Sequence, residues 1–155
     1  MSLLTSLLRG AAAGAAGTTA LNAATYLDMT LRGRPSSSTP EQTVQKGAEL
    51  FGVHVGDDDT SQARASGGGA LLGILAGVGT GAVLGAARAA GWHSGFAGTT
   101  AATWSLVMLA GNGPMTVLGV SDPRTWGADA WVADVVPHAA YAVVAAATLL
   151  GLEPS

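Results

Sequence analysis

The chain has 155 residues, of which 48% are hydrophobic and 11% charged, with 23 glycines, no cysteine and a formal net charge of −3. This length predicts a single domain, and the absence of cysteine excludes disulfides, thiolate metal sites and cysteine nucleophiles. Because the few basic residues form no tract, nucleic acid is not an expected partner.

Formal charges are spaced unevenly, and four long stretches contain none. A membrane-spanning helix needs about 20 predominantly apolar residues, so each stretch is long enough. The charge-free stretches are residues 10–27, 65–87, 89–121 and 135–152. They predict an all-α fold, a four-helix transmembrane bundle that makes one membrane domain of residues 1–155. The expected spanning helices cover residues 7–28, 66–88, 95–112 and 131–151.

The first predicted helix, 7–28, is the least apolar of the four, because three threonines and Asn22 interrupt it. A cleaved signal peptide is one alternative for this segment. It is disfavoured because Arg9 follows the first leucines instead of preceding the apolar run. A soluble alanine-rich bundle is a second alternative. It is disfavoured because a surface helix needs a polar side, which the long charge-free stretches do not offer.

The connection 29–64 is the longest polar segment, and it contains the start signal of a short helix, 40–51. We expect Thr39 as the N-cap, Pro40 in the first turn and Gln42 reaching back to the cap. One side of this helix is apolar and the other carries glutamates. Such a short amphipathic helix is expected on the membrane surface or over the end of the bundle.

The run Asp57-Asp58-Asp59 precedes the second spanning helix, 66–88. Three carboxylates could bind Ca²⁺, but they lack the alternating spacing and the distal glutamate of an EF-hand loop. We favour a capping role, in which these carboxylates accept from the free N–H groups of the helix start and stabilise its positive dipole end.

Helix 66–88 carries a glycine at every fourth position, a row that falls on one face of the helix. The five positions are Gly69, Gly73, Gly77, Gly81 and Gly85. In water each interior glycine costs a helix roughly 1 kcal/mol relative to alanine, whereas in a membrane small residues let two helices pack backbone to backbone. The row therefore predicts a glycine-zipper interface, with helix 7–28 or 131–151 of the same chain or with another copy.

The third predicted helix, 95–112, ends at Gly111-Asn112-Gly113-Pro114, which is a turn or helix-end signal. The connection 113–130 then contains a short helical turn that begins at Asp122-Pro123. Trp126 and Trp131 flank Asp129, a pattern typical of the headgroup region of a membrane, where indole rings settle.

Polar residues at membrane depth are the candidates for function. Asp134, His138 and Tyr141 share one face of helix 131–151, and Asn22 and Asp28 lie on helix 7–28. Three interpretations of Asp134 and His138 stay open: interhelical hydrogen bonds, a proton or cation relay, and a metal ligand pair. We favour hydrogen bonds, because a metal site would need His54 or His93 nearby and a relay would need more partners.

The two halves of the chain resemble each other. Gly-Thr-Thr-Ala at 17–20 recurs at 98–101, and Met-Thr at 29–30 recurs at 115–116. This predicts two parallel repeats, each a spanning helix, a connection and a second spanning helix. A duplication that serves packing alone is the simpler alternative and the one we favour.

Basic residues set the expected orientation. Five flank the two longer connections and two flank the opposite side, which places both connections in the cytoplasm and both termini outside. The five are Arg32, Arg34, Lys46, Arg64 and Arg124, and the two are Arg9 and Arg88.

The run from Gly14 to Thr43, which includes Asn-Ala-Ala-Thr-Tyr-Leu-Asp-Met-Thr from Asn22 onward, resembles small uncharacterised integral membrane proteins of actinobacteria. The motif Pro137-His138-x-x-Tyr141 is similar to the YagU-like family of four-helix inner-membrane proteins, although Ala142 stands where that family usually has glycine. The resemblance implies a multi-pass bacterial inner-membrane protein and carries no activity with it.

The sequence contains no catalytic motif, so we expect a non-enzymatic membrane scaffold or accessory subunit without a cofactor. Its expected partners are the lipid bilayer and either further copies of itself or the subunits of a membrane complex. The alternative function is a small transporter or channel whose polar path runs through Asn22, Asp28, Asp134 and His138, with Tyr141 beside it.

Overall fold

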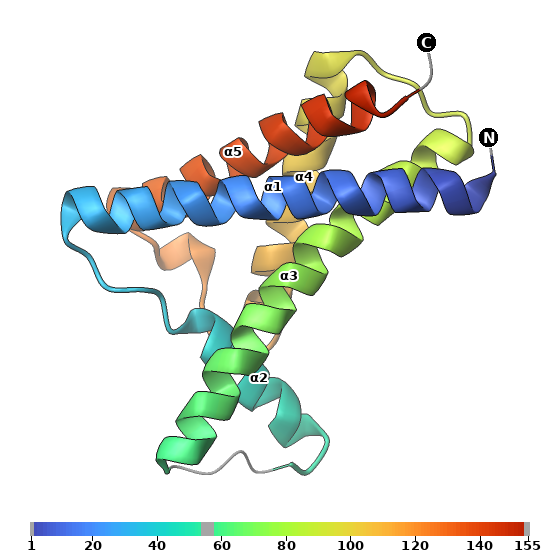
Figure 1. The fold of residues 1–155 in the computed structure, drawn as a ribbon. Helices are drawn as coiled ribbons and strands as arrows, with labels where there is room; N and C mark the ends of the chain where they lie inside the picture. The colour runs from blue at the N-terminus through green and yellow to red at the C-terminus, as the bar shows by residue number, and fades with distance from the viewer. Residues whose placement is uncertain (1, 54–57, 154–155) are drawn as a thin grey trace.

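The structure is a computed structural model that describes residues 2–53 and 58–153 (Figure 1). All regular secondary structure in this part of the chain is helical, with no strand, which confirms the all-α class. The elements are α1 (Leu3–Arg32), α2 (Thr39–Leu50), α3 (Asp59–Ala89), α4 (Phe96–Val117), the 3₁₀ helix η1 (Pro123–Thr125) and α5 (Ala128–Gly151).

The four long helices alternate in direction. The amino end of α1, the carboxyl end of α3 and the carboxyl end of α5 lie together at one end of the molecule, and the two longer connections lie at the other (Figure 1). Helix α1 crosses both α3 and α5, whereas α4 packs mainly on α5. Each half of the chain therefore has the same order: a long helix, a connection with a short helix, and a second long helix.

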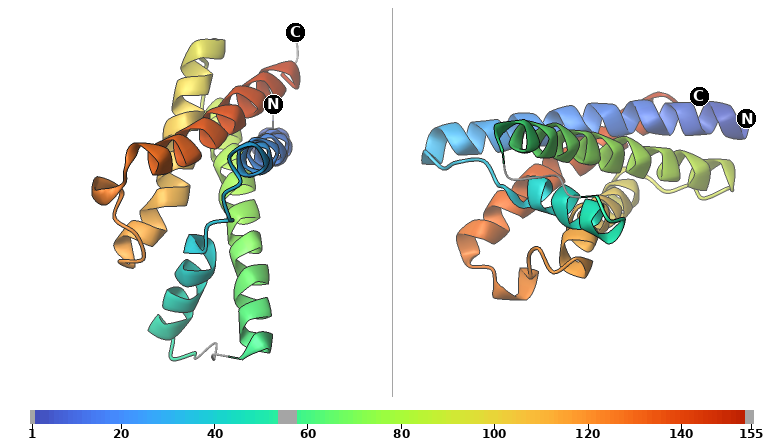
Figure 2. Two further views of the ribbon diagram at one scale, coloured as in Figure 1. Left: turned by 90° about the vertical axis from the view of Figure 1, so that its left-hand side faces the viewer. Right: turned by 90° about the horizontal axis from the view of Figure 1, so that it is seen from below.

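Helix α2 runs beside the amino-terminal half of α3 (Figure 2). Two glycines of α3 make this contact possible, because a Cβ built on Gly68 would lie 3.0 Å from a methyl of Val44, and one on Gly69 would lie 3.1 Å from the backbone of Pro40. The short helix packs along α3 and thus does not lie apart from the long helices.

The buried core is small and formed mainly by α5. One cluster joins Ala13, Leu84 and Leu149, with Leu106 packed against it. The other joins Val107, Tyr141 and Ala145, with Leu21 against it. Because α5 supplies residues to both clusters, it is the helix that ties α1, α3 and α4 together.

Two of the described helices, α3 and α5, are long and apolar enough to cross a membrane. Only 28% of the most apolar window of α3, and 33% of that of α5, is buried inside the structure. The prediction of four spans is not confirmed for α1 and α4, because threonine, glycine and asparagine lower the hydropathy of both helices.

The predicted end of the third spanning helix is wrong. Helix α4 continues through Gly111-Asn112-Gly113-Pro114 to Val117. What terminates the helix is a Schellman motif just beyond Val117, in which Gly119 is the left-handed residue, with a φ of 67°. Its two hydrogen bonds run from Val120 N to Met115 O at 2.8 Å and from Gly119 N to Thr116 O at 3.1 Å.

Two predicted helix starts differ in detail. The N-cap of α2 is Ser38, not Thr39, and the Gln42 side chain donates to the Ser38 hydroxyl at 3.1 Å. Helix α3 begins at Asp59, seven residues before the predicted start at residue 66, and the Asp58 carboxylate accepts from the backbone N–H of Ser61 at 2.8 Å. Asp57 lies outside the described residues. The other long helices also extend beyond their predicted bounds, α1 by four residues at each end.

Candidate functional site

The closest approach between helices is the crossing of α1 and α3, where backbones meet without side chains between them. A Cβ built on Gly81 would lie 2.6 Å from the Cα of Gly14, and one on Gly85 would lie 3.2 Å from the Cα of Gly10. Such distances are shorter than van der Waals contact, so only glycine fits at these positions. Four glycines therefore set how closely α1 and α3 approach.

The five-glycine row of α3 is divided among different neighbours. Gly77, Gly81 and Gly85 lie against α1, and Gly69 lies against the start of α2. Gly73 stands between them with nothing within 4 Å of a built Cβ. The row thus packs mostly inside the chain, with one unoccupied position at its centre.

Tyr141 fills the point where α1, α3 and α5 meet. Its side chain is fully buried, and its hydroxyl donates to the carbonyl of Gly77 at 2.5 Å. Gly17 of α1 makes room for the ring, since a Cβ there would lie 2.7 Å from the Cδ2 of Tyr141. Tyr141 therefore joins the glycine crossing and does not extend a polar path from His138.

Asp134 and His138 form a small polar cluster with Asn112 between α4 and α5. The Asn112 amide donates to one carboxylate oxygen of Asp134 at 3.0 Å, and the other lies 3.3 Å from the His138 Nδ1. The side chains of Asp134 and His138 are each 15% exposed. The structure thus brings two predicted site residues together with Asn112. From the sequence, Asn112 is only part of a helix-end signal and has no predicted functional role.

The imidazole of His138 has a defined orientation. Its Nδ1 lies 2.7 Å from the backbone carbonyl of Asp134, which can only accept, so Nδ1 carries the hydrogen. The opposite nitrogen, Nε2, faces α4 at Gly111, where a built Cβ would lie 3.2 Å away. His93 lies in the turn before α4, at the opposite end of that helix from Asn112, and its Nδ1 is in hydrogen-bond contact with the Gly91 carbonyl. It therefore does not join Asp134 and His138 as a third metal ligand. His54 lies outside the described residues.

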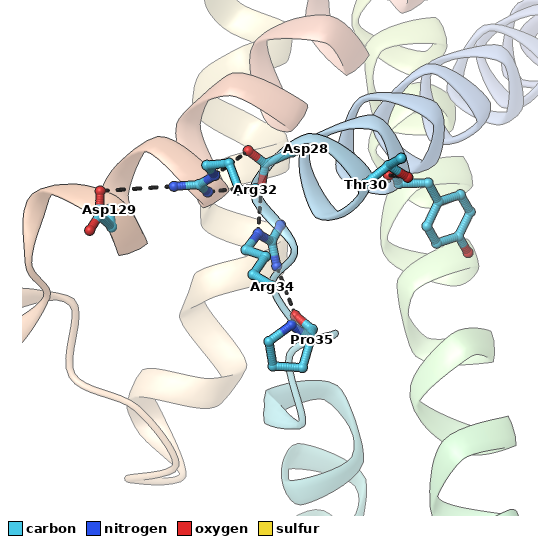
Figure 3. A network of polar contacts seen from close by, with 7 residues as sticks. Asp28, Thr30, Arg32, Arg34, Pro35 and Asp129 are labelled. Carbon is cyan, nitrogen blue, oxygen red and sulfur yellow. Dashed lines mark hydrogen bonds and ion pairs between the residues drawn. The ribbon is translucent and has the colours of Figure 1, made fainter.

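Asp28 belongs to a separate cluster at the end of α1 (Figure 3). Its carboxylate accepts from Arg32 at 2.6 and 2.8 Å and from Arg34 at 2.5 Å, and Arg32 also reaches Asp129 at 3.9 Å. The hydrogen bonds from Arg32 and then Arg34 lower the pKa of the Asp28 carboxyl to about 2. Asp28 is the first charged residue after the stretch 10–27, so this cluster lies beyond the apolar part of α1.

Asn22 is exposed on α1. No hydrogen bond or ion pair seen among the described residues connects Asn22 or Asp28 with the cluster of Asn112, Asp134 and His138. The four residues predicted to line a path thus occupy three separate places.

Arg88, which served in the sequence only as a flanking charge for the orientation, has a structural role in the fold. Its side chain is 3% exposed and donates to the Thr99 hydroxyl at 2.8 Å and to the carbonyls of Trp92 and Ser94. Its Nε lies 2.8 Å from a carboxylate oxygen of Glu153, beyond the end of α5. The guanidinium therefore joins the α3–α4 turn, α4 and the end of α5. An arginine that closes a charge-free stretch four residues before a tryptophan is the signal that could have indicated this role.

Two shallow grooves open on the surface. One, of about 300 Å³, runs between α4 and α5 and is lined by Thr100, Ala101, Trp104, Val135, Ala139, Ala142 and Val143. The other, of about 230 Å³, lies between α2 and the turn after α4, and is lined by Gln42, Gln45, Lys46, Glu49, Gly119 and Val120. Neither groove is lined by the predicted path residues.

Comparisons with protein-family models, with curated proteins and with solved structures found no match to this chain. The resemblance to the YagU-like family and to actinobacterial membrane proteins therefore stays a prediction.

Proposed function

We propose that this chain is a non-enzymatic, multi-pass membrane scaffold or accessory subunit in which all four long helices cross the bilayer. The observation that carries the proposal is the α1–α3 crossing, where Gly10 and Gly14 meet Gly81 and Gly85 without side chains between them. In lipid, where apolar burial does not drive helices together, small residues that let backbones pack closely are a common way to hold two helices in contact.

The distribution of charge supports four spans. The charge-free stretches of α1, α3 and α5 contain 18 to 23 residues. At 1.5 Å per residue these stretches are about 27–34 Å long, close to the ~30 Å hydrocarbon thickness of a bilayer. Since the helices alternate in direction, their charges gather at two opposite ends.

The exposed apolar surface supports the same proposal. Large hydrophobic side chains are exposed on every long helix, for example Leu27 on α1 (59%), Leu71 on α3 (61%) and Leu109 on α4 (68%). Soluble monomers rarely expose contiguous patches of this kind, whereas a bilayer covers them.

Single cysteines test the topology without background, because the chain has none of its own. Ser37→Cys lies in the α1–α2 connection and His93→Cys in the α3–α4 turn, and both positions are exposed. With both termini outside, a membrane-impermeant maleimide should label His93→Cys in intact cells, and Ser37→Cys only after lysis. A chain that stays soluble without detergent, or one labelled equally at both positions, contradicts the proposal.

A second candidate function is a small transporter or channel, and the cluster of Asn112, Asp134 and His138 supports it. Within the described residues, the ion-pair partner of Asp134 is His138, which is charged only when protonated. A mostly buried carboxylate without a fixed cation is a candidate for binding a proton or a cation. If His138→Ala abolished flux into liposomes while the protein stayed assembled, this candidate would replace the scaffold.

A further inference from the structure

The middle of α3 is exposed on every side. Five consecutive residues, Leu71 to Leu75, are all exposed, although α2 covers the helix before them and α1 covers it after them. Because successive residues point about 100° apart around a helix, five in a row leave no side covered. Leu71 and Leu75 are 61% and 69% exposed.

One face of this helix stays uncovered over a longer distance. Leu72, Leu75, Gly79 and Val83 follow the 3–4 spacing of a helix-packing seam and lie opposite the glycines that contact α1. We call these four residues the outer face of α3. Leu75 and Val83 are 69% and 55% exposed, and a Cβ built on Gly79 meets nothing within 4 Å.

The total surface of the chain is larger than its mass predicts. It exposes 8635 Å², whereas a compact monomer of 15.2 kDa exposes about 7,100 Å². The excess of about 1,500 Å² exceeds the ~800 Å² that each partner buries in a standard stable interface. This excess belongs to the whole chain, and it is large enough to include one interface of standard size.

From these observations we infer that the outer face of α3 is the interface with a second copy of this chain, an inference that rests on the proposed membrane location. A two-fold axis along the membrane normal places α3 of one copy parallel to α3 of the other, with each face against itself. Gly79 then lies at the crossing point, and Leu75 and Val83 flank it on both copies. No charged residue lies between Arg64 and Arg88, so this self-contact brings no like charges together.

The inference differs from what the glycine row alone suggests. Gly77, Gly81 and Gly85 are occupied by α1 of the same chain, so they are unavailable to another copy. Within the span of the row, two glycines have open space at a built Cβ: Gly73, which belongs to the row, and Gly79, which does not. Of these two, Gly79 lies on the outer face of α3.

Disulfide cross-linking in membranes tests the inference. Leu75→Cys on the outer face is compared with Leu109→Cys, which is equally exposed near the middle of α4. Under mild oxidation at low protein-to-lipid ratio, we expect several-fold more cross-linked dimer with Leu75→Cys. Adding Gly79→Leu should reduce its yield to that of the Leu109→Cys control. Helical circular dichroism should not change, because the new side chain points into open space within one copy.

The outcomes are distinguishable. An inserted chain in which Leu75→Cys and Leu109→Cys cross-link equally, or in which Gly79→Leu has no effect, overturns the inference and leaves lipid as the cover of this face. A chain that alkaline carbonate removes from the membrane overturns the proposed membrane location, and the inference with it.

Discussion

Replacing Gly81 with alanine adds one methyl group at the α1–α3 crossing. The added Cβ would lie 2.6 Å from both the Cα and the N of Gly14, and both are backbone atoms that cannot rotate away. Ordinary contact between carbon atoms is about 3.5–4.0 Å, so the two helices must separate by roughly 1 Å. Overpacking of this kind costs about 1–3 kcal/mol, while alanine returns about 1 kcal/mol of helix propensity.

Gly73→Ala is the matched control. It lies on the same face of the same helix and brings the same gain in propensity, but its Cβ meets nothing within 4 Å. The difference in unfolding free energy between the two variants therefore isolates the contact, and we expect about 1–3 kcal/mol in favour of Gly73→Ala. The measurement is reversible denaturation in detergent micelles, followed by circular dichroism. Equal stability of the two variants would mean that the backbone contact at Gly81 does not limit how closely α1 and α3 approach.

Three further results are expected. Tyr141→Phe leaves the Gly77 carbonyl without its 2.5 Å donor and should lower the unfolding free energy by about 0.6–1.7 kcal/mol, measured by the same denaturation. Arg88→Gln should loosen the end of α5, seen as faster amide hydrogen exchange near Glu153, and Lys46→Gln, an exposed cation, should not. Because the pKa of the Asp28 carboxyl is lowered to about 2, its ion pairs with Arg32 and Arg34 add to the free energy of unfolding. This contribution is complete above pH 3.8, the ordinary pKa, and is lost as the pH falls through about 2. Asp28→Asn should remove this part of the pH dependence of unfolding, measured by the same denaturation at several pH values.

The helices were predictable because each depends on local information. Charge spacing located the four long helices, and Pro40 marked the start of α2 to within a residue. Helix α3 begins at Asp59, seven residues before its predicted start at residue 66. The end of α4 was not predictable from Gly111-Asn112-Gly113-Pro114, because an interior proline removes one hydrogen bond but does not stop a helix that packs on α5. The signal that does end it, Gly119, is one glycine among 23.

The pairing of polar residues was harder to predict from the sequence, because it depends on how the helices are placed relative to one another and not on the periodicity of any one helix. Asp134, His138 and Tyr141 share one face by spacing, yet the structure separates them. Asp134 and His138 meet Asn112 on α4, while Tyr141 reaches Gly77 on α3. Helix spacing predicts which residues share a face within about one turn. It does not predict which neighbouring helix covers each part of that face.

The least apolar helix is also the one that the glycine row requires. Backbone contact at Gly81 and Gly85 needs small residues on the opposing helix, and α1 supplies them with Gly10 and Gly14. Glycine and alanine add little hydropathy, so a helix that meets this demand scores poorly as a membrane span. The small residues of this packing face thus contribute to the weak signal of α1, together with the exposed Thr19 and Asn22. In a chain with a strong glycine row, a neighbouring segment that is small and nearly charge-free is the first candidate for its partner.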